Sequence, residues 1–448
     1  MEIQLSRIKE KLTGIQKYDK GLVVFGADSH GYQVGACVSI EEVAVLEQKY
    51  NIQLPEAYVA FVTQIGNGNS NENAYRESAA GPYYGIYPLG GGLEDLSMED
   101  GEQFLSYPCL LDPDMCNDVW NRRVKEYNNT QQTRADYLKH TAALFGGLLP
   151  IGTQGDAAIT CLVLNGKHKG RIVYLHDTYL SDFAHESNLL AWYERWLDEL
   201  ISGELVRDGG EDFGYALGGS NESLWLAYQE SRTEKGQLLY LRTLLTRSTV
   251  SKEILDEIVE AIPKTANQVK LSLISIVAAK KFHVAIPFLE EQIEDNLLFV
   301  LQHIHWYAED KAYWLPMLEY YKDKIDEIET YRFYTYIAAK ATPDFGNLVL
   351  SKLTSPLVTM RQQTIFILGK LENRQAYASY FITALEDEDY YVVLYSIQAL
   401  KGVKDERLPQ AYAVVYQKYK NRAEDYYIIE NLKHRLEEMQ LTLEDLQA

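Results

Sequence analysis

The chain has 448 residues, of which 46% are hydrophobic and 24% charged, and its formal net charge is −21. This length predicts two to four domains that each bury a core, and this composition is that of a globular protein and not of a disordered one. Residues 1–218 carry −14 and residues 219–448 carry −7, so both halves repel nucleic acid, which binds mainly through Lys and Arg. We therefore expect a basic protein partner and no nucleic acid.

No segment has the pattern of a signal peptide or a membrane span. Residues 1–12 mix apolar with charged side chains, and the longest uncharged run, residues 141–155, is shorter than the roughly 20 residues that a span needs. The four cysteines show neither a CxxC pair nor a regular framework, so we expect reduced thiols. The sequence predicts a soluble, cytoplasmic protein with no membrane partner.

The first strong elements are two helices. After a short amphipathic helix and two candidate strands in residues 1–38, Ser39 and Glu42 have the spacing of a capping box, which predicts a helix start. Pro55 suits the first turn of a second helix. Tyr58, Phe61 and the apolar residues that follow recur at helical spacing, which indicates a buried stripe.

An aromatic glycine-proline segment and an acidic run come next. Three tyrosines around a glycine turn cannot all face inward on the expected strand 83–89, and tyrosine is a favourable interface anchor. The acidic side chains beside them form a negative surface that could steer a cationic partner. The sequence therefore gives one candidate partner-binding set: Tyr83, Tyr84, Tyr87, Glu94, Asp95, Glu99, Asp100 and Glu102.

Residues 159–164 and 171–175 are predicted to pair as a β-hairpin around Asn165-Gly166, and residues 189–201 to form a helix. Residues 203–222 are glycine-rich and lack an apolar face, so residues 206–222 are predicted to be a linker. Beyond it, apolar residues recur in steps of about 32, including Phe333, Tyr336 and Leu368, which indicates repeated helix pairs that stack.

The order of these motifs resembles the SMI1/KNR4 (SUKH) family over residues 30–205. The match rests on the capped helix, Leu-Pro, the aromatic helix, Gly-Asn-Gly, the later Leu149-Pro150-Ile151-Gly152, and the helix that contains Trp192 and Trp196. Residues 361–400 resemble HEAT-like repeats, and a tetratricopeptide array is the nearest competitor. We predict an α+β SUKH-like domain with a mixed sheet over residues 1–205, then the linker, and an all-α HEAT-like solenoid over residues 223–448.

The resemblance implies protein binding and no enzymatic activity, because bacterial SUKH proteins are largely immunity proteins that neutralise toxins. The expected partner is a basic toxin domain, such as a nuclease. The alternative is a regulatory or assembly scaffold without a toxin partner, as fungal members of the family are.

Catalytic and metal-binding patterns are weak, so no cofactor or metal is expected. The glycines at 90–92 lack the GxxxxGK[ST] of a phosphate loop, and the aspartates near residue 112 lack the glycine and glutamate of a calcium loop. His168, His176 and His185 near Asp177 and Asp182 leave an acid–base or metal site as a third hypothesis, although their spacing fits no common ligand set.

Overall fold

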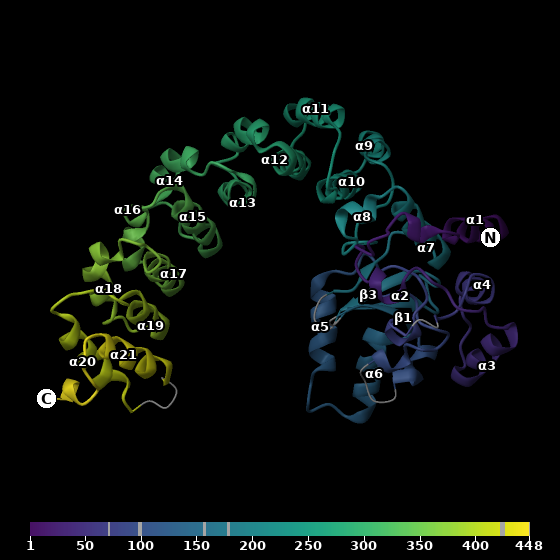
Figure 1. Cartoon of the computed structure of the whole chain (residues 1–448), viewed down its shortest axis with the longest axis horizontal. Helices are drawn as coiled ribbons and strands as arrows, with labels where there is room; N and C mark the ends of the chain where they lie inside the picture. The colour runs from purple at the N-terminus through teal and green to yellow at the C-terminus, as the bar shows by residue number, and fades with distance from the viewer. Residues whose placement is uncertain (70–71, 97–100, 156–157, 177–179, 422–425, 448) are drawn as a thin grey trace. The chain divides into compact units, whose positions relative to one another are not determined.

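The computed structural model describes residues 1–69, 72–96, 101–155, 158–176, 180–421 and 426–447. The chain divides into two compact units, Met1–Ile254 and Leu255–Ala448, which we call the N-terminal unit and the C-terminal unit (Figure 1). The N-terminal unit combines a small sheet with helices, and the described part of the C-terminal unit is helical.

The N-terminal unit contains the following elements: α1 (Glu2–Leu12), η1 (Ile15–Lys17), α2 (Ala27–His30), α3 (Ile40–Tyr50), α4 (Glu56–Gln64), η2 (Tyr75–Glu77), η3 (Leu93–Asp95), η4 (Gly101–Ser106), α5 (Asn117–Tyr127), α6 (Arg134–Phe145), β1 (Leu148–Gly155), β2 (Ala158–Val163), β3 (Ile172–His176), β4 (Asp182–Phe183), α7 (Leu189–Ile201), α8 (Glu204–Asp208), α9 (Asn221–Glu230) and α10 (Glu234–Thr246). The boundary between the units falls within α11 (Lys252–Ala261).

The four strands form one sheet in the order β1-β2-β3-β4, and every pair is antiparallel. The predicted hairpin is therefore present, whereas the predicted mixed sheet is wrong. A parallel pair needs a crossover of a dozen or more residues, and the connections between these strands are all shorter than that.

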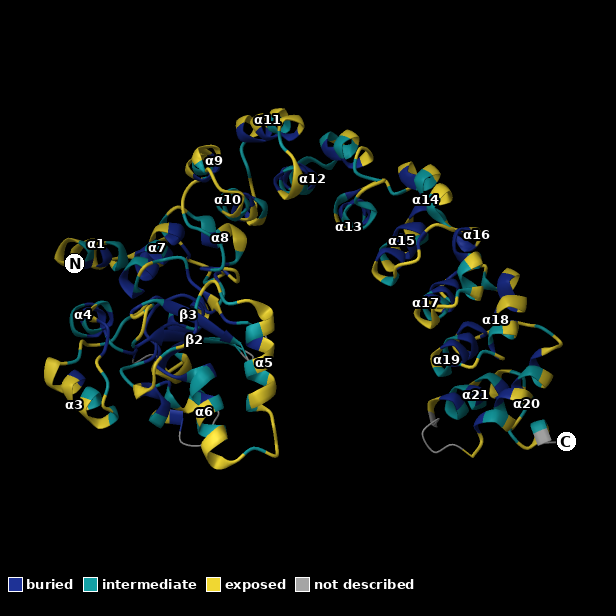
Figure 2. Cartoon of the chain, turned by 180° about the vertical axis from the view of Figure 1, so that it is seen from behind, coloured by how far each residue is buried: buried dark blue, intermediate teal, exposed yellow. Residues whose placement is uncertain are grey.

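Both faces of the sheet are covered. Successive side chains of a strand point to opposite faces, so Leu149 and Ile151 join one core while Leu148 joins the other. The first core contains buried residues of α4 and α7, and the second contains Trp120 of α5 and Leu144 of α6. The strands therefore form the buried centre of the N-terminal unit (Figure 2).

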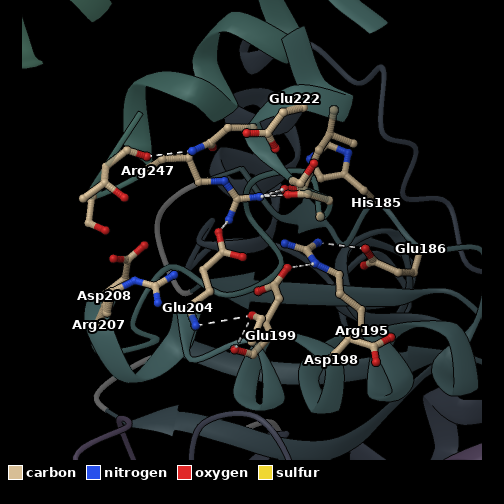
Figure 3. Close-up of a pocket in the computed structure, with 18 residues that line it drawn as sticks. His185, Glu186, Arg195, Asp198, Glu199, Glu204, Arg207, Asp208, Glu222 and Arg247 are labelled. Atoms are coloured by element: carbon tan, nitrogen blue, oxygen red, sulfur yellow. Dashed lines mark hydrogen bonds and ion pairs between the residues drawn. The ribbon is translucent and has the colours of Figure 1, made fainter. Parts of the chain in front are cut away.

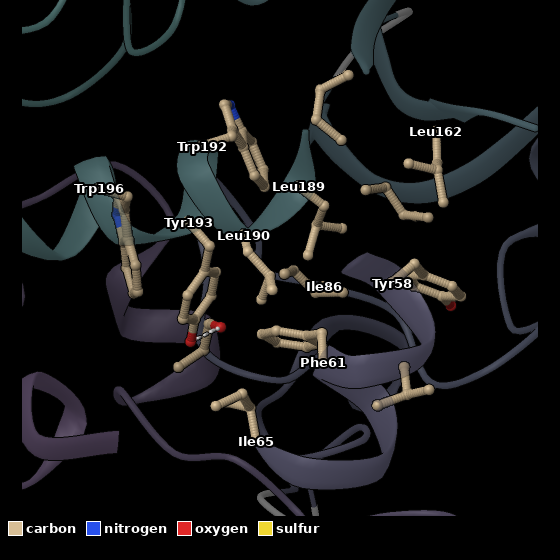
Figure 4. Packing of buried hydrophobic residues seen from close by; sticks show 14 of the residues in the cluster. Tyr58, Phe61, Ile65, Ile86, Leu162, Leu189, Leu190, Trp192, Tyr193 and Trp196 are labelled. Carbon is tan, nitrogen blue, oxygen red and sulfur yellow. Dashed lines mark hydrogen bonds between the residues drawn. The ribbon is translucent and has the colours of Figure 1, made fainter. Parts of the chain in front are cut away.

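Aromatic side chains dominate the contact between α4 and α7 (Figure 4). The ring of Phe61 lies edge-on to that of Tyr193, with centroids 4.8 Å apart. The Tyr193 hydroxyl donates to the Ala80 carbonyl at 2.8 Å, and the Trp192 indole donates to the Tyr174 hydroxyl at the same distance. These buried polar tips therefore keep hydrogen-bond partners, which removes the cost of burying them.

The opening helices form as predicted. The Ser39 hydroxyl accepts from the Glu42 N–H at 3.2 Å, and the Glu42 carboxylate accepts from the Ser39 N–H at 2.8 Å, which completes the capping box of α3. Pro55 precedes α4, and Tyr58 and Phe61 are buried on its inner face. The two strands expected within residues 1–38 and the strand expected at residues 83–89 are not formed; the last segment makes one isolated bridge, from Ile86 to Ala79.

The predicted linker is packed into the N-terminal unit. Phe213 is buried in its core, and the Phe213 carbonyl accepts from the hydroxyls of Tyr83 at 2.5 Å and Tyr174 at 3.2 Å. Gly209 and Gly214 have positive φ angles, which glycine adopts without strain. Here the glycines make tight turns, and the division between the compact units lies more than 30 residues further along the chain.

The C-terminal unit continues with these elements: η5 (Ile262–Lys264), α12 (Asn267–Glu290), α13 (Leu297–Tyr307), η6 (Ala312–Trp314), α14 (Leu315–Tyr321), α15 (Ile328–Ala341), α16 (Gly346–Val349), η7 (Leu350–Thr354), α17 (Val358–Leu368), η8 (Arg374–Tyr377), α18 (Ala378–Ala384), α19 (Tyr390–Ala399), α20 (Leu408–Tyr419), α21 (Tyr426–Glu438) and η10 (Asp445–Gln447).

The odd-numbered helices α13 to α21 pack each against the next, and α14, α18 and α20 pack on them from the other side (Figure 1). The buried column runs through Leu301, Tyr334, Ile365 and Ile397. The predicted step of 32 placed Phe333 in this column, and that assignment is wrong by one residue, because the step into α15 is 33 and the next is 31. Tyr336, expected in the core, is 37% exposed for the same reason.

By length and composition, α12 is the one described helix that could cross a membrane, and 39% of its apolar window is buried. It is not continuous: Lys281 has φ −149° and ψ 71°, so two helices meet there at a kink. Leu273, Ile276 and Val277 of its first part are buried in the unit. These residues are accounted for by packing within the protein.

Candidate protein-binding surface

The aromatic glycine-proline segment, residues 81–87, lies along the free edge of β1. The Tyr87 N–H donates to the Ile151 carbonyl at 2.8 Å, and the Tyr84 N–H donates to the Thr153 carbonyl at 3.4 Å. Gly85 has φ +94°, and a Cβ there would meet the Ala79 carbonyl oxygen at 2.2 Å. Only glycine fits this turn, which fixes the directions of the tyrosines on either side.

The three candidate tyrosines have different surroundings. Tyr83 and Tyr87 are 3% and 1% exposed, so the prediction that they anchor a partner is corrected: both face inward. The Tyr83 hydroxyl reaches the Phe213 carbonyl, which the sequence placed in a separate linker. Tyr84 is half-buried, and its ring lies 5.9 Å from that of Tyr75, which is 43% exposed. The aromatic pair that reaches the surface is therefore the exposed Tyr75 and the half-buried Tyr84.

Arg76 connects the aromatic and acidic parts of this region. Its guanidinium lies 5.5 Å from the Tyr75 ring and 5.7 Å from the Tyr87 ring, and it forms an ion pair with Asp95. Burial, followed by the Asp95 carboxylate, raises the pKa of the Tyr87 hydroxyl. Asp95 is thus neutralised by an arginine and does not act as a free negative charge. In the sequence, the dipeptide Tyr75-Arg76 beside a tyrosine-rich segment was the signal from which this contact could have been predicted.

The remaining acidic candidates fall into two groups. Glu94 of η3 and Glu102 of η4 are exposed, and η4 contacts both η3 and α3. Glu99 and Asp100 lie outside the described residues. We call Tyr75, Tyr84, Glu94 and Glu102 the acidic–aromatic surface.

Each histidine near the hairpin has a hydrogen-bond partner, and two of them share Tyr215. His168 contacts the Asp112 carboxylate at 3.1 Å, while His176 contacts the Tyr215 hydroxyl at 3.2 Å and His185 the Tyr215 carbonyl at 3.3 Å. Asp177 lies outside the described residues. Within the described ranges, no three His, Cys, Asp or Glu side chains converge as metal ligands would.

A charged pocket of about 730 Å³ lies beside α7, between it and the ends of α8 and α10 (Figure 3). Arg195 contacts the Glu186 carboxylate at 2.7 Å and the Glu199 carboxylate at 2.6 Å. Arg247 forms an ion pair with Glu204, and it donates to the Leu217 and Gly219 carbonyls, both at 3.0 Å. Four of these side chains come from α7 and the segments next to it, and Arg247, which follows α10, is the one distant in sequence.

The charges in this pocket stabilise one another. Burial opposes the charge of Arg195, but Glu199 and Glu186 outweigh it and raise the pKa of the guanidinium. Burial raises the pKa of Glu199, and Arg195 opposes that shift. Carboxylates and carbonyls already engage both arginines, so neither guanidinium is free to bind a ligand. Their contacts connect α9 and α10 with α7.

Polar contacts between α1 and α7 hold the N-terminal helix in place. Glu194 of α7 accepts from Gln4, Arg7 and Lys11 of α1 at 2.7–3.1 Å. The hydrogen bond from Arg7 is the main cause that lowers the pKa of Glu194, to about 2. Helix α1 is therefore an integral part of the N-terminal unit.

Comparison with known proteins agrees with this architecture. Residues 37–198 match the sequence model of the SMI1 / KNR4 family (SUKH-1). The comparisons with curated proteins and with solved structures gave no match. The matched range runs from before α3 into α7, ending at residue 198, and includes the whole sheet, the 81–87 segment and the acidic–aromatic surface. Residues 37–198 are therefore an SMI1/KNR4 (SUKH) domain, to which the chain adds α1 before it and a large helical part after it.

Proposed function

We propose that the protein is a cytoplasmic immunity protein whose N-terminal unit binds and neutralises a basic bacterial toxin domain, such as a nuclease. The observation that carries the proposal is the SUKH domain at residues 37–198, because SUKH domains are protein-interaction modules known in immunity proteins. The family is generally non-enzymatic, and we propose that this chain performs no catalysis either.

The charge distribution supports the proposal. Residues 1–218, which contain the SUKH domain, carry −14. A nuclease that grips phosphates presents Lys and Arg, and opposite charges steer two proteins together. Glu94 and Glu102 are exposed and the rings of Tyr75 and Tyr84 are in contact, so the acidic–aromatic surface can combine steering with aromatic anchors.

We also propose that the C-terminal unit is a HEAT-like solenoid. Its helices contact mainly their neighbours along the chain, which is the contact pattern of a stacked repeat. This part gives the protein a second surface for binding, and it also favours the alternative function, a regulatory or assembly scaffold that has no toxin partner.

The test uses the full chain and the protein encoded directly upstream of it. Expression of that upstream protein in a bacterial host should arrest growth, and co-expression of the chain should restore it. The purified pair should form a complex whose association rate falls steeply with salt. An upstream product that is not toxic, or toxicity that the chain does not relieve, would favour the scaffold.

Variants locate the contact. Glu94→Lys with Glu102→Lys should slow association on the order of tenfold at low salt. Glu230→Lys with Glu253→Lys changes the net charge equally at exposed positions outside the SUKH domain and serves as the control. Equal slowing by both pairs would show general electrostatic attraction and would remove the acidic–aromatic surface from the proposal.

A further inference from the structure

One face of the C-terminal unit exposes a large aromatic side chain on each of four helices, α13, α15, α17 and α19, which pack side by side in this order. Trp306 of α13 is 54% exposed, Tyr336 of α15 37%, Phe366 of α17 39% and Tyr391 of α19 51%. Single exposed aromatics are common on protein surfaces, whereas a contiguous series of them marks an interaction site.

These residues lie on the same side of their helices. An α-helix turns 100° per residue, and we measured each position from the buried column of Leu301, Tyr334, Ile365 and Ile397. The four aromatics, together with Tyr395 and Arg332, fall within an arc of roughly 100° opposite that column. Because α13, α15, α17 and α19 pack in this order, the arcs form one continuous face.

Contacts between helices join the rings into two clusters. The ring of Phe333 on α15 lies 5.8 Å from that of Trp306 and 6.3 Å from that of Tyr336. The ring of Tyr395 on α19 lies 5.6 Å from that of Phe366 and 6.0 Å from that of Tyr391. We call these six residues the aromatic face; Phe333 is half-buried and lies outside the arc, at the edge of this face.

Beside the aromatic face lie three cations, Arg332, Lys340 and Lys370, and one exposed carboxylate, Glu329 of α15. Lys370 places its ammonium 4.0 Å from the Phe366 ring centroid, and Lys340 and Arg332 are exposed on α15. Helices α13 and α19 contain no Asp, Glu, Lys or Arg. Residues 255–448 as a whole contain 29 acidic and 21 basic residues, so this local excess of cations runs against the composition of the unit.

We propose that the aromatic face binds an acidic, extended segment of a partner protein, with its apolar side chains on the rings and its carboxylates near Arg332, Lys340 and Lys370. Four packed helices at interaxial spacings of 8–10 Å span roughly 27 Å, which about eight residues of extended chain cover. The proposal is independent of toxin binding, which involves the N-terminal unit.

The main competing occupant is single-stranded nucleic acid, since stacked rings and cations also suit bases and phosphates. The observations favour a polypeptide. The three cations, two on α15 and one just after α17, neutralise only a few phosphates, and the unit's net charge of −8 repels a polyanion.

The experiment uses the full chain and three labelled 12-residue probes, with binding followed by fluorescence anisotropy. One peptide alternates glutamate with leucine, one alternates lysine with leucine, and the third probe is oligouridine. Of the three probes, we expect only the glutamate–leucine peptide to bind saturably. The double variant Lys340→Glu/Lys370→Glu should weaken it at least tenfold, and Tyr336→Ser/Phe366→Ser should weaken it comparably.

The matched control is Lys264→Glu/Lys420→Glu, which changes the net charge equally at exposed lysines on η5 and after α20. It should leave the affinity within twofold of the unmodified chain. Failure of the glutamate peptide to bind, equal binding of the lysine peptide, or tighter binding of oligouridine would each overturn the proposal. Retention of affinity in Lys340→Glu/Lys370→Glu would also overturn it. The helical circular dichroism of every variant reports whether it has folded.

Discussion

The two units bury charge differently. Among the described residues, every buried Asp, Glu and Arg lies in the N-terminal unit, including Glu194, Glu199 and Arg247. In the C-terminal unit the buried polar residues are His, Thr and Ser; Thr364 and Ser396, for example, donate to the carbonyl four residues back in their own helices. One unit therefore depends on polar contacts between segments far apart in the sequence, and the other on contacts within a helix or between neighbouring helices, such as Tyr331 with Thr364.

This difference follows from how each unit is built. The elements of the N-terminal unit meet across long sequence separations, as when α1 contacts α7, and buried charge pairs can fix such contacts in one arrangement. A stack of similar helices needs only apolar contact between neighbours. The comparison predicts that a destabilising substitution affects the whole N-terminal unit, whereas in the C-terminal unit its effect is confined to neighbouring helices.

The largest expected effect is from Arg195→Met. This change leaves Glu186 and Glu199 without their buried partner and removes the contact of Arg195 with the Phe213 ring. We therefore expect the free energy of unfolding of the N-terminal unit to fall by about 3–5 kcal/mol. Urea denaturation followed by tryptophan fluorescence gives this loss, since four of the six tryptophans lie in that unit.

The matched change in the C-terminal unit is Arg361→Met. Its bidentate pair with Asp387, at 2.8 and 3.0 Å, is more open to solvent, so we expect a loss of about 1 kcal/mol. Equal losses in the two variants would contradict the difference between the units.

Substitutions that open a cavity in the core test how far the destabilisation extends in each unit. Leu368→Ala in α17 and Leu197→Ala in α7 each remove a fully buried side chain, and each should cost about 2–5 kcal/mol. Hydrogen exchange should accelerate mainly in α15, α17 and α19 for the first variant and throughout the N-terminal unit for the second. Uniform acceleration over residues 255–448 in the Leu368 variant would show that the unit unfolds as a whole.

A pH dependence is expected from His30, which is buried against Tyr32 and Trp196. Burial lowers its pKa from 6.5 to about 4. The unfolded chain takes up the proton first, so stability is complete above pH 6.5 and is lost as the pH falls toward 4. Between pH 7.5 and pH 5 the N-terminal unit should lose about 2 kcal/mol from this residue.

The variant His30→Gln isolates that contribution, because His185 also has a pKa lowered by burial and adds a slope of the same sign. The variant should be less stable than the unmodified chain at pH 7.5 but should show a flatter profile down to pH 5. An unchanged slope would show that His30 does not titrate as its burial implies. This range also stays above the pH at which carboxylates such as Glu194 take up protons.

Features that depend on local chemistry could be predicted. The capping box at Ser39, Pro55 before α4 and the helix Leu189–Ile201 all formed where the sequence placed them. Each rests on contacts within a few residues, so the pattern carries the information. The antiparallel hairpin of β2 and β3 is also a local pairing and was also predicted.

Features that depend on distant neighbours could not be predicted. Spacing alone could not show that Tyr83 would be buried by Phe213, 130 residues away, or that Arg76 would engage Asp95. The glycines after residue 203 indicated a linker, whereas their positive φ angles serve turns inside a packed core. A one-residue change in repeat length moved Tyr336 from the expected core to the surface.

The sequence by itself determined the SUKH domain, the series of helices after it and the acidic character of the chain, because these follow from composition, short motifs and periodicity. Only the tertiary structure decided which of the 34 tyrosines face solvent and which charges are already paired. The physical reason is that burial and pairing depend on side chains brought together by folding, often more than 100 residues apart in the chain.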